Sequence, residues 1–181
     1  MDAQTNVTST GQKIRTVDIT VTAAMAALVF LGTYIFKIPT ISGYVHLGDC
    51  MILLTVALFG MKKGAIAGAI GGGLSDFIGG YFYWVVPTLL IKCMWAIVMG
   101  LIMHKVLKDK KGSFLIGAIA GGVLHIIAYT LVRVVLYGGK TAIIEIPALA
   151  FQTGVGIVIG FVIYMLLKKS GVAGRLSGMV K

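Results

Sequence analysis

The sequence predicts an all-α membrane protein with six transmembrane helices in one compact bundle and both termini in the cytoplasm. Of the 181 residues, 58% are hydrophobic, and the mean hydropathy of +0.98 is too high for a soluble domain. Most of the 16 lysine and arginine residues cluster between apolar runs, on the side that both termini share. The positive-inside rule gives cytoplasmic loops this arrangement, so the net charge of +10 does not indicate nucleic acid as a partner.

The first predicted helix covers residues 19–36, a run long enough to span a bilayer. One face of this helix carries small residues about four positions apart, where another helix can approach closely. These residues are Ala23, Ala24 and Ala27. Pro39 and Gly43 then end regular structure and predict the first outer loop.

The second predicted helix follows the motif Gly-Tyr-Val-His-Leu-Gly-Asp at residues 43–49 and ends at Lys62 and Lys63. The third covers residues 64–80. It begins with glycines that recur every four residues, a pattern that permits tight packing against neighbouring helices.

The fourth predicted helix, residues 85–103, follows four aromatic residues at 81–84 that form a belt typical of a membrane interface. A basic loop at 105–112 leads to the fifth helix, residues 113–137. The sixth covers residues 143–167 and ends in further lysines.

Three parts of the chain are therefore expected. Residues 1–16 form a cytoplasmic N-terminal segment, which has no cleavage site and is not a signal peptide. Residues 17–169 form the six-helix transmembrane domain, and residues 170–181 form a cytoplasmic tail.

Five polar residues inside the predicted helices lie at one depth in the membrane. Each is about 13–16 residues from the nearest cytoplasmic lysine of its own helix, or about 20–24 Å at a helical rise of about 1.5 Å per residue. The five are Asp49, Asp76, Lys92, His125 and Gln152. Ionisable groups at that depth are costly unless polar groups face them. Together with His46, and with aromatic walls from Tyr81, Trp84 and Tyr129, they predict a polar-floored pocket that opens outward.

A structural ion pair between Lys92 and either Asp49 or Asp76 explains the same charges without a ligand. A histidine on an apolar helix, such as His125, is also commonly a satisfied core residue. The coincidence of depth across several helices favours a binding site. Within it, we expect His46 and Asp49 nearest the ligand and Asp76 with Lys92 as the more structural pair.

No catalytic or metal-binding motif accompanies this layer. The sequence has no phosphate-binding loop for ATP hydrolysis, no metalloprotease motif and no nucleophile elbow. Cys50 and Cys93 lack ligand-like spacing and are expected to be buried thiols. Arg133 and Glu145 fall near the outer interface, where a simple rim pair is expected. We predict a protein that is not an enzyme and has no cofactor and no metal.

The chain resembles the substrate-binding S components of energy-coupling factor (ECF) vitamin transporters. The resemblance covers essentially the whole chain and is densest from residue 23 to residue 100. It rests on Lys37-Ile-Pro39, the motif at 43–49, the glycine-rich run from Gly64 to Asp76, and Pro87-Thr-Leu-Leu-Ile-Lys92. Within the family, the sequence resembles most the group that binds hydroxymethylpyrimidine and pyridoxine.

The resemblance implies a multi-pass protein of a prokaryotic plasma membrane. It implies that the chain captures a vitamin outside the cell and works with a transmembrane T component and two ABC-type ATPases. The small-residue face at Ala23, Ala24 and Ala27 resembles the patch by which the family's first helix meets the T component. The polar layer suits a small neutral heteroaromatic with hydroxyl or amino groups, stacked on Tyr or Trp.

Three alternatives remain open from the sequence. The chain is an S component for another vitamin, such as riboflavin or pantothenate, or it is a stand-alone carrier or channel. The third is an intramembrane enzyme that uses Asp49 and Asp76 as a pair, against which the nearby Lys92 argues for ion pairing.

Overall fold

Helices make up 82% of the structure, a computed structural model that describes residues 15–179. The helices are α1 (Thr16–Tyr34), α2 (Asp49–Phe59), α3 (Met61–Ile78), α4 (Phe82–Gly100), α5 (Ser113–Tyr137), α6 (Gly139–Lys169) and α7 (Val172–Gly178). A π-helical turn, η1 (Leu101–Val106), continues α4. Two short strands, β1 (Ile38–Pro39) and β2 (Tyr44–Val45), form an antiparallel hairpin in which Ile38 faces Val45 and Pro39 faces Tyr44.

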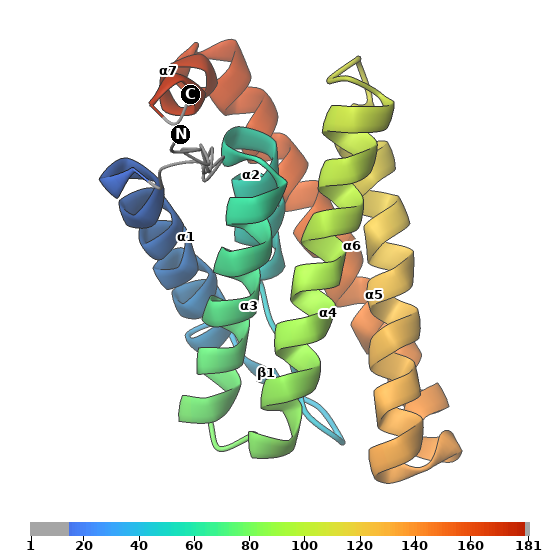
Figure 1. Ribbon diagram of the computed structural model, residues 1–181. Coiled ribbons are helices and arrows are strands. Elements are labelled where there is room, and N and C mark those ends of the chain that lie inside the picture. The colour runs from blue at the N-terminus through green and yellow to red at the C-terminus, as the bar shows by residue number, and fades with distance from the viewer. Residues whose placement is uncertain (1–14, 180–181) are drawn as a thin grey trace, which may run out of the picture.

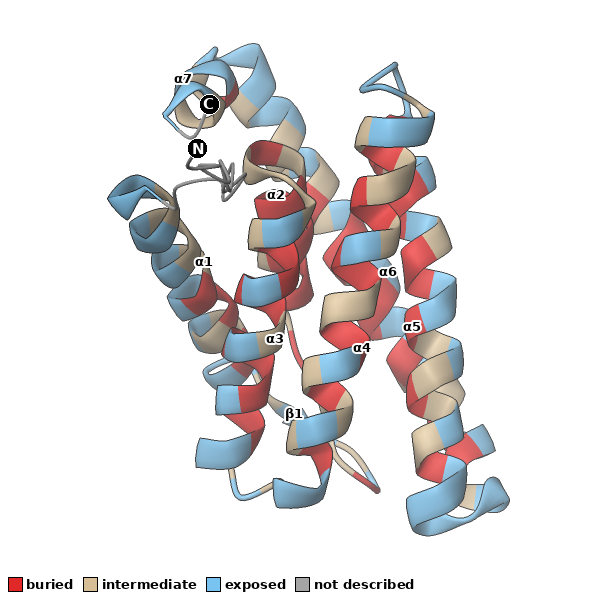
Figure 2. Cartoon of the chain, viewed as in Figure 1, coloured by how far each residue is buried: buried red, intermediate tan, exposed pale blue. Residues whose placement is uncertain are grey.

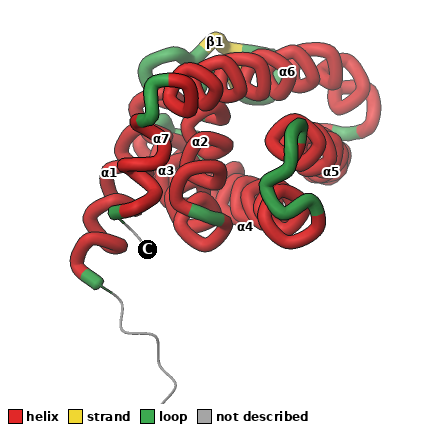
Figure 3. The backbone as a smooth tube through the Cα atoms, turned by 90° about the horizontal axis from the view of Figure 1, so that it is seen from above, coloured by secondary structure: helices red, strands yellow, loops and turns green. Residues whose placement is uncertain are grey.

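The helices run side by side along one axis (Figure 1). The two described ends of the chain and the turn between η1 and α5 lie at one end of the bundle, and β1 lies toward the other. Most of the basic clusters therefore gather at the end that holds the termini. Figure 3 shows α1 at one edge of the bundle and α5 toward the opposite edge.

Each of the six predicted runs coincides with one of the helices α1 to α6. Four helical segments within residues 15–179 are long and apolar enough to cross a membrane: α1, α4 with η1, α5 and α6. The helix α2 is apolar but has only 11 residues, and α3 carries Lys62, Lys63 and Asp76. The protein is therefore a helical membrane protein, and the count of six spans remains a prediction.

Two of the sequence expectations about the chain ends need comment. The predicted polar tail, 170–181, contains the short helix α7, whose Ala173 is buried. Its neighbours include α2 and α6, so this segment packs back on the bundle. The expected N-terminal segment, 1–16, lies outside the described residues except for Arg15 and Thr16.

Close packing of α3 depends on its glycines, both those of the predicted four-residue row, such as Gly64, and others, such as Gly71. A Cβ at Gly64 would lie 2.3 Å from Val56 Cγ2 of α2. One at Gly71 would lie 2.5 Å from the Ala26 carbonyl oxygen of α1. A side chain at either position would push a neighbouring helix away, so the glycines set the distances between these helices.

The helix α2 is the most enclosed part of the bundle, and α1 is among the most open (Figure 2). Ile52, Leu53 and Val56 of α2 are fully buried and belong to the main hydrophobic core. On α1, by contrast, the residues predicted to dock a partner are all exposed: Ala23, Ala24 and Ala27.

Candidate functional site

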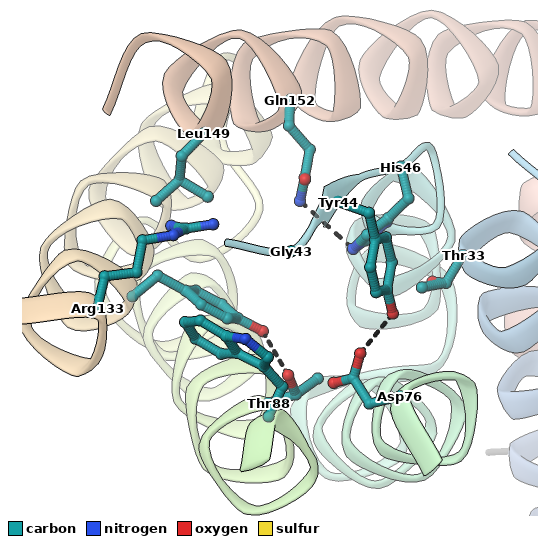
Figure 4. A pocket seen from close by; sticks show the side chains of 11 residues that line it. Thr33, Gly43, Tyr44, His46, Asp76, Thr88, Arg133, Leu149 and Gln152 are labelled. Atoms are coloured by element: carbon teal, nitrogen blue, oxygen red, sulfur yellow. Dashed lines mark hydrogen bonds between the residues drawn. The ribbon is translucent and has the colours of Figure 1, made fainter. Parts of the chain in front are cut away.

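A cavity lies where the loop between α1 and α2 folds over the helices (Figure 4). It encloses about 420 Å³ of empty space, part of which is continuous with the surrounding solvent. Five helices and the loop contribute lining residues, namely Thr33, Gly43, Tyr44, His46, Asp76, Trp84, Thr88, Tyr129, Arg133, Leu149 and Gln152.

One wall of the cavity is aromatic and held by hydrogen bonds. The Trp84 ring centroid lies 5.6 Å from that of Tyr129, and Trp84 is 5% exposed. The Trp84 indole N–H lies 3.1 Å from both the Ser42 carbonyl oxygen and the Tyr137 hydroxyl. Tyr129 donates a 2.9 Å hydrogen bond to the Thr88 hydroxyl. These bonds fix both rings, so they offer a planar ligand a preformed surface for stacking.

Asp76 of α3 lines the opposite part of the cavity (Figure 4). The Tyr44 hydroxyl donates a hydrogen bond to Asp76 Oδ1. The other carboxyl oxygen, Oδ2, is buried and has no hydrogen-bond partner in the described part of the chain, and the same holds for Thr33 Oγ1. Buried polar atoms without partners are uncommon and costly, so this region is suited to a ligand that supplies the missing bonds.

Arg133 lies between the aromatic wall and α6. Its Nε is 2.9 Å from Glu145 Oε2 and donates a 3.2 Å hydrogen bond to the Ser42 hydroxyl. Its guanidinium carbon is 5.3 Å from the Trp84 ring centroid. The predicted pair of Arg133 and Glu145 therefore forms, but it is not an exposed rim pair, because both side chains are buried. The outer loop covers them, with the backbone N–H of Ser42 also donating to Glu145 Oε1.

A second polar cluster lies outside the cavity lining and is completely buried. Lys92 Nζ bonds to Asp49, and it lies 3.1 Å from His125 Nε2. Gln152 donates a 2.7 Å hydrogen bond to Asp49 Oδ2, and His125 Nδ1 is 3.1 Å from the Thr153 hydroxyl. Asp49, Lys92 and His125 are each at most 1% exposed. Neutralised charges with several hydrogen bonds are the form in which ions persist in a membrane interior.

This cluster corrects the expected pairing of Asp76 with Lys92. The stem of Lys92 crosses α3 at Gly72, where a Cβ would lie 3.5 Å from Lys92 Cγ. The ammonium group thereby reaches Asp49, at the first turn of α2, where a helix N-terminus also favours a carboxylate. Asp49 is thus the structural partner of Lys92, and Asp76 is the carboxylate in the cavity lining.

Gln152 links the two clusters, because it lines the cavity and also bonds to Asp49. Its Nε2 lies 3.4 Å from His46 Nε2. Burial lowers the pKa of His46 to about 4, so the imidazole is neutral at pH 7. His46 Nδ1 accepts a 3.1 Å hydrogen bond from the Gly48 N–H.

The outer loop is also held in place by Lys37. Its Nζ lies 4.3 Å from the Tyr34 ring centroid and 4.7 Å from that of Tyr44, and it donates a 3.4 Å hydrogen bond to the Ser75 carbonyl oxygen. Burial lowers the pKa of Lys37, and the nearby Asp76 opposes that shift. The contacts join the end of α1, the loop and the end of α3 on one side of the cavity.

The structure brings five of the nine predicted site residues into the cavity lining: His46, Asp76, Trp84, Tyr129 and Gln152. Asp49, Lys92 and His125 form the buried cluster described above, and Tyr81 packs against Tyr44 with ring centroids 4.9 Å apart. The predicted aromatic belt divides, since Phe82 and Tyr83 are exposed whereas Trp84 points inward.

Sequence reasoning did not assign Thr33, Tyr44, Thr88 or Arg133 to the site. A signal existed for Arg133, which is a charge within an apolar run, and for Tyr44, which belongs to the motif at 43–49. Threonines in membrane helices commonly bond to their own backbone, so Thr33 and Thr88 gave no signal.

Two comparisons relate the chain to known proteins. The family described as "ECF-type riboflavin transporter, S component" matches residues 13–169. A protein of Pyrococcus woesei, described as "Uncharacterized protein in gap 3'region", is 36% identical over 132 residues, which cover 73% of this chain and 87% of that protein.

Proposed function

The chain belongs to the family of ECF-type riboflavin transporter S components, and from this premise we propose that it captures a heteroaromatic vitamin outside the cell. Members of this family are substrate-binding subunits of transporters and not enzymes. The observation that carries the proposal is the cavity, in which the fixed rings of Trp84 and Tyr129 face the polar groups of Asp76 and Gln152.

The proposed topology has six spans in a prokaryotic plasma membrane, with both termini in the cytoplasm. The basic clusters near the termini favour this orientation by the positive-inside rule. The cavity then lies toward the outer side, under the loop that carries β1 and β2. A ligand would enter from outside and would be enclosed by that loop.

Riboflavin is the first candidate ligand, because the matching family is described as riboflavin-type. Hydroxymethylpyrimidine and pyridoxine form the second candidate class, which the sequence resemblance favoured. All three ligands are uncharged heteroaromatics with hydroxyl groups and suit the same aromatic wall.

Transport would depend on a T component and two ABC-type ATPases. The docking face for the T component would be the exposed small-residue surface of α1 at Ala23, Ala24 and Ala27. Small side chains let a second helix approach closely in a membrane, where van der Waals packing drives helix association.

Tryptophan fluorescence tests capture directly, because the chain has only two tryptophans. Trp84 lines the cavity, whereas Trp95 is fully buried and donates a 3.1 Å hydrogen bond to the Ala118 carbonyl oxygen. Pyridoxine or riboflavin should change the emission of the wild-type protein. Trp84→Phe should abolish most of that change, and the control Trp95→Phe should keep it. The opposite pattern would place the ligand elsewhere.

Proteoliposomes separate the proposal from a stand-alone carrier. Vesicles that contain this chain alone should bind labelled vitamin without accumulating it. Vesicles that also contain the T component and ATPases should accumulate it when ATP is present. Substrate-specific flux through the chain alone would contradict the proposed division of labour.

A further inference from the structure

Two buried polar atoms without hydrogen-bond partners in the described chain belong to residues that line the cavity from opposite sides (Figure 4). They are Oδ2 of Asp76 and Nη1 of Arg133. The two residues are 3% and 5% exposed, respectively. One atom accepts a hydrogen bond and the other donates one. The cavity therefore presents a hydrogen-bond acceptor on the α3 side and a hydrogen-bond donor on the α5 side, which would fix the orientation of a bound ligand.

The two side chains differ in how their charge is balanced. Arg133 lies 2.9 Å from Glu145, so its positive charge is matched and its free N–H offers a hydrogen bond without requiring an anion. Asp76 has the neutral Tyr44 hydroxyl as its partner, and none of the ion pairs formed within residues 15–179 includes it. Lys37 and Lys92 are close enough for their charges to act on Asp76 but form no ion pair with it. An anion in this cavity would thus face a carboxylate without a directly bonded cation in the described chain, which is unfavourable in a low-dielectric site.

The donor lies over the aromatic wall. The Arg133 guanidinium is 5.3 Å from the Trp84 ring centroid and 6.0 Å from that of Tyr129. A planar ligand that packs against this wall and the guanidinium would have an edge near Arg133 Nη1. Its other end would point toward Asp76 and the neighbouring hydroxyl of Thr33, which also has no partner in the described chain.

We propose that Asp76 and Arg133 determine substrate specificity as a pair. The ligand is a neutral planar heteroaromatic that accepts a hydrogen bond from Arg133 Nη1 at one end and donates one, through N–H or O–H, to Asp76 Oδ2 at the other. The same pair rejects anionic vitamins. This inference rests on the proposed capture of a heteroaromatic vitamin and adds the residues and ligand groups that select it.

Asp76→Asn is the most informative variant, because it changes the acceptor of the pair and keeps the shape of the side chain. The carboxamide oxygen can still accept the Tyr44 hydrogen bond, while the NH₂ group places a donor where the ligand's donor must bind. The affinity for the neutral ligand should fall about tenfold to a hundredfold, as expected for loss of a hydrogen bond to a charged group. The affinity for pantothenate, an anion, should rise, because the negative charge that repels it is gone. The control Asp109→Asn makes the same chemical change at an exposed residue outside the cavity.

Arg133→Lys tests the other member of the pair, the hydrogen-bond donor. Lysine keeps the positive charge beside Glu145 but lacks the planar fork that presents Nη1 to the cavity. The affinity for the neutral ligand should again fall about tenfold or more, with little change in the exclusion of pantothenate. The variant also keeps the test informative if Asp76→Asn does not fold, because the two substitutions lie on different helices.

Binding is measured by calorimetric titration of the purified full-length protein with riboflavin, pyridoxine, hydroxymethylpyrimidine and pantothenate. The neutral vitamin that the wild-type protein binds most tightly serves as the probe for the variants. Wild-type binding of that probe, with loss in both variants and an altered preference in Asp76→Asn alone, is the expected result. Unchanged affinities in the folded variants would overturn the assigned pair and leave the proposed function standing. A wild-type protein that binds none of the three neutral vitamins would instead overturn the proposed function.

Discussion

The ion pair of Asp49 and Lys92 makes the most quantitative stability prediction. Lys92→Met removes the ammonium group and leaves the buried Asp49 carboxylate with the Gln152 amide. Removing one partner of a buried pair costs about 3–5 kcal/mol. His125 Nε2 also loses its 3.1 Å contact with Lys92, which adds about 1 kcal/mol. The single variant should therefore lose about 4–6 kcal/mol of unfolding free energy, a large part of the total of about 5–15 kcal/mol for a typical domain.

The matched double variant Lys92→Met with Asp49→Asn should recover most of that loss. Its asparagine oxygen can still accept from Gln152, and no buried charge remains unpaired. Neither Asp49 nor Lys92 lines the cavity, so the double variant should also bind the vitamin. Reversible unfolding in mixed detergent gives the free energies, and titration gives the affinity. A single variant as stable as the wild type, or a double variant no more stable than the single one, would refute this reasoning.

Three further predictions concern the loop, the cavity and the docking face. Gly48→Ala should destabilise the fold by about 1–3 kcal/mol, because its Cβ would lie 2.0 Å from Thr33 Oγ1. A Cβ in the control Gly154→Ala would have no atom within 4 Å, so this variant should fold normally. Equal melting temperatures of the two variants would contradict this packing. Burial keeps His46 neutral with a pKa of about 4, below the unfolded value of about 6.5, so its contribution to stability is present above about pH 6.5 and is lost as the pH falls toward 4. Unfolding measured against pH should show a shallower decline in His46→Gln, and identical curves would mean that His46 is not the group responsible. Ala27→Trp, on the exposed face of α1, should leave vitamin binding intact and abolish ATP-driven uptake; normal uptake by this variant in cells would exclude that face as the docking surface.

The helices were predictable because each is a long apolar run that ends at glycine, proline or lysine. The relative height of two of the polar residues along the helices was predictable as well, since a fixed rise per residue converts sequence position into height. Counting residues brought Asp49, Asp76 and Lys92 to one level, and the structure places Lys92 in contact with Asp49.

The direction in which each polar side chain points around its helix axis was not predictable in the same way. Lys92 passes over Gly72 to reach α2, so Asp49 and Asp76 exchanged their expected roles. A helix that packs on several neighbours can direct a polar side chain toward any of them, and only the packed bundle decides which. Sequence periodicity is weak evidence here, because most faces of a membrane helix are apolar.

The contacts that the outer loop makes with the helices could not be predicted from the sequence either. Ser42 bonds to Trp84, Arg133 and Glu145, and thereby turns an expected rim pair into a buried part of the site. Such contacts join residues about 40 to 100 positions apart, and no local pattern encodes them. The motif that contains Tyr44 and His46 marked the loop as unusual without revealing what it covers.

The most direct test of the central claim is identification, by mass spectrometry, of the small molecule released from protein purified from its native membrane. The account predicts an uncharged heteroaromatic vitamin that carries both a hydrogen-bond donor and an acceptor, in amounts well above those from the Asp76→Asn variant. An anionic aliphatic vitamin such as pantothenate, or equal amounts of every small molecule from the two proteins, would contradict it.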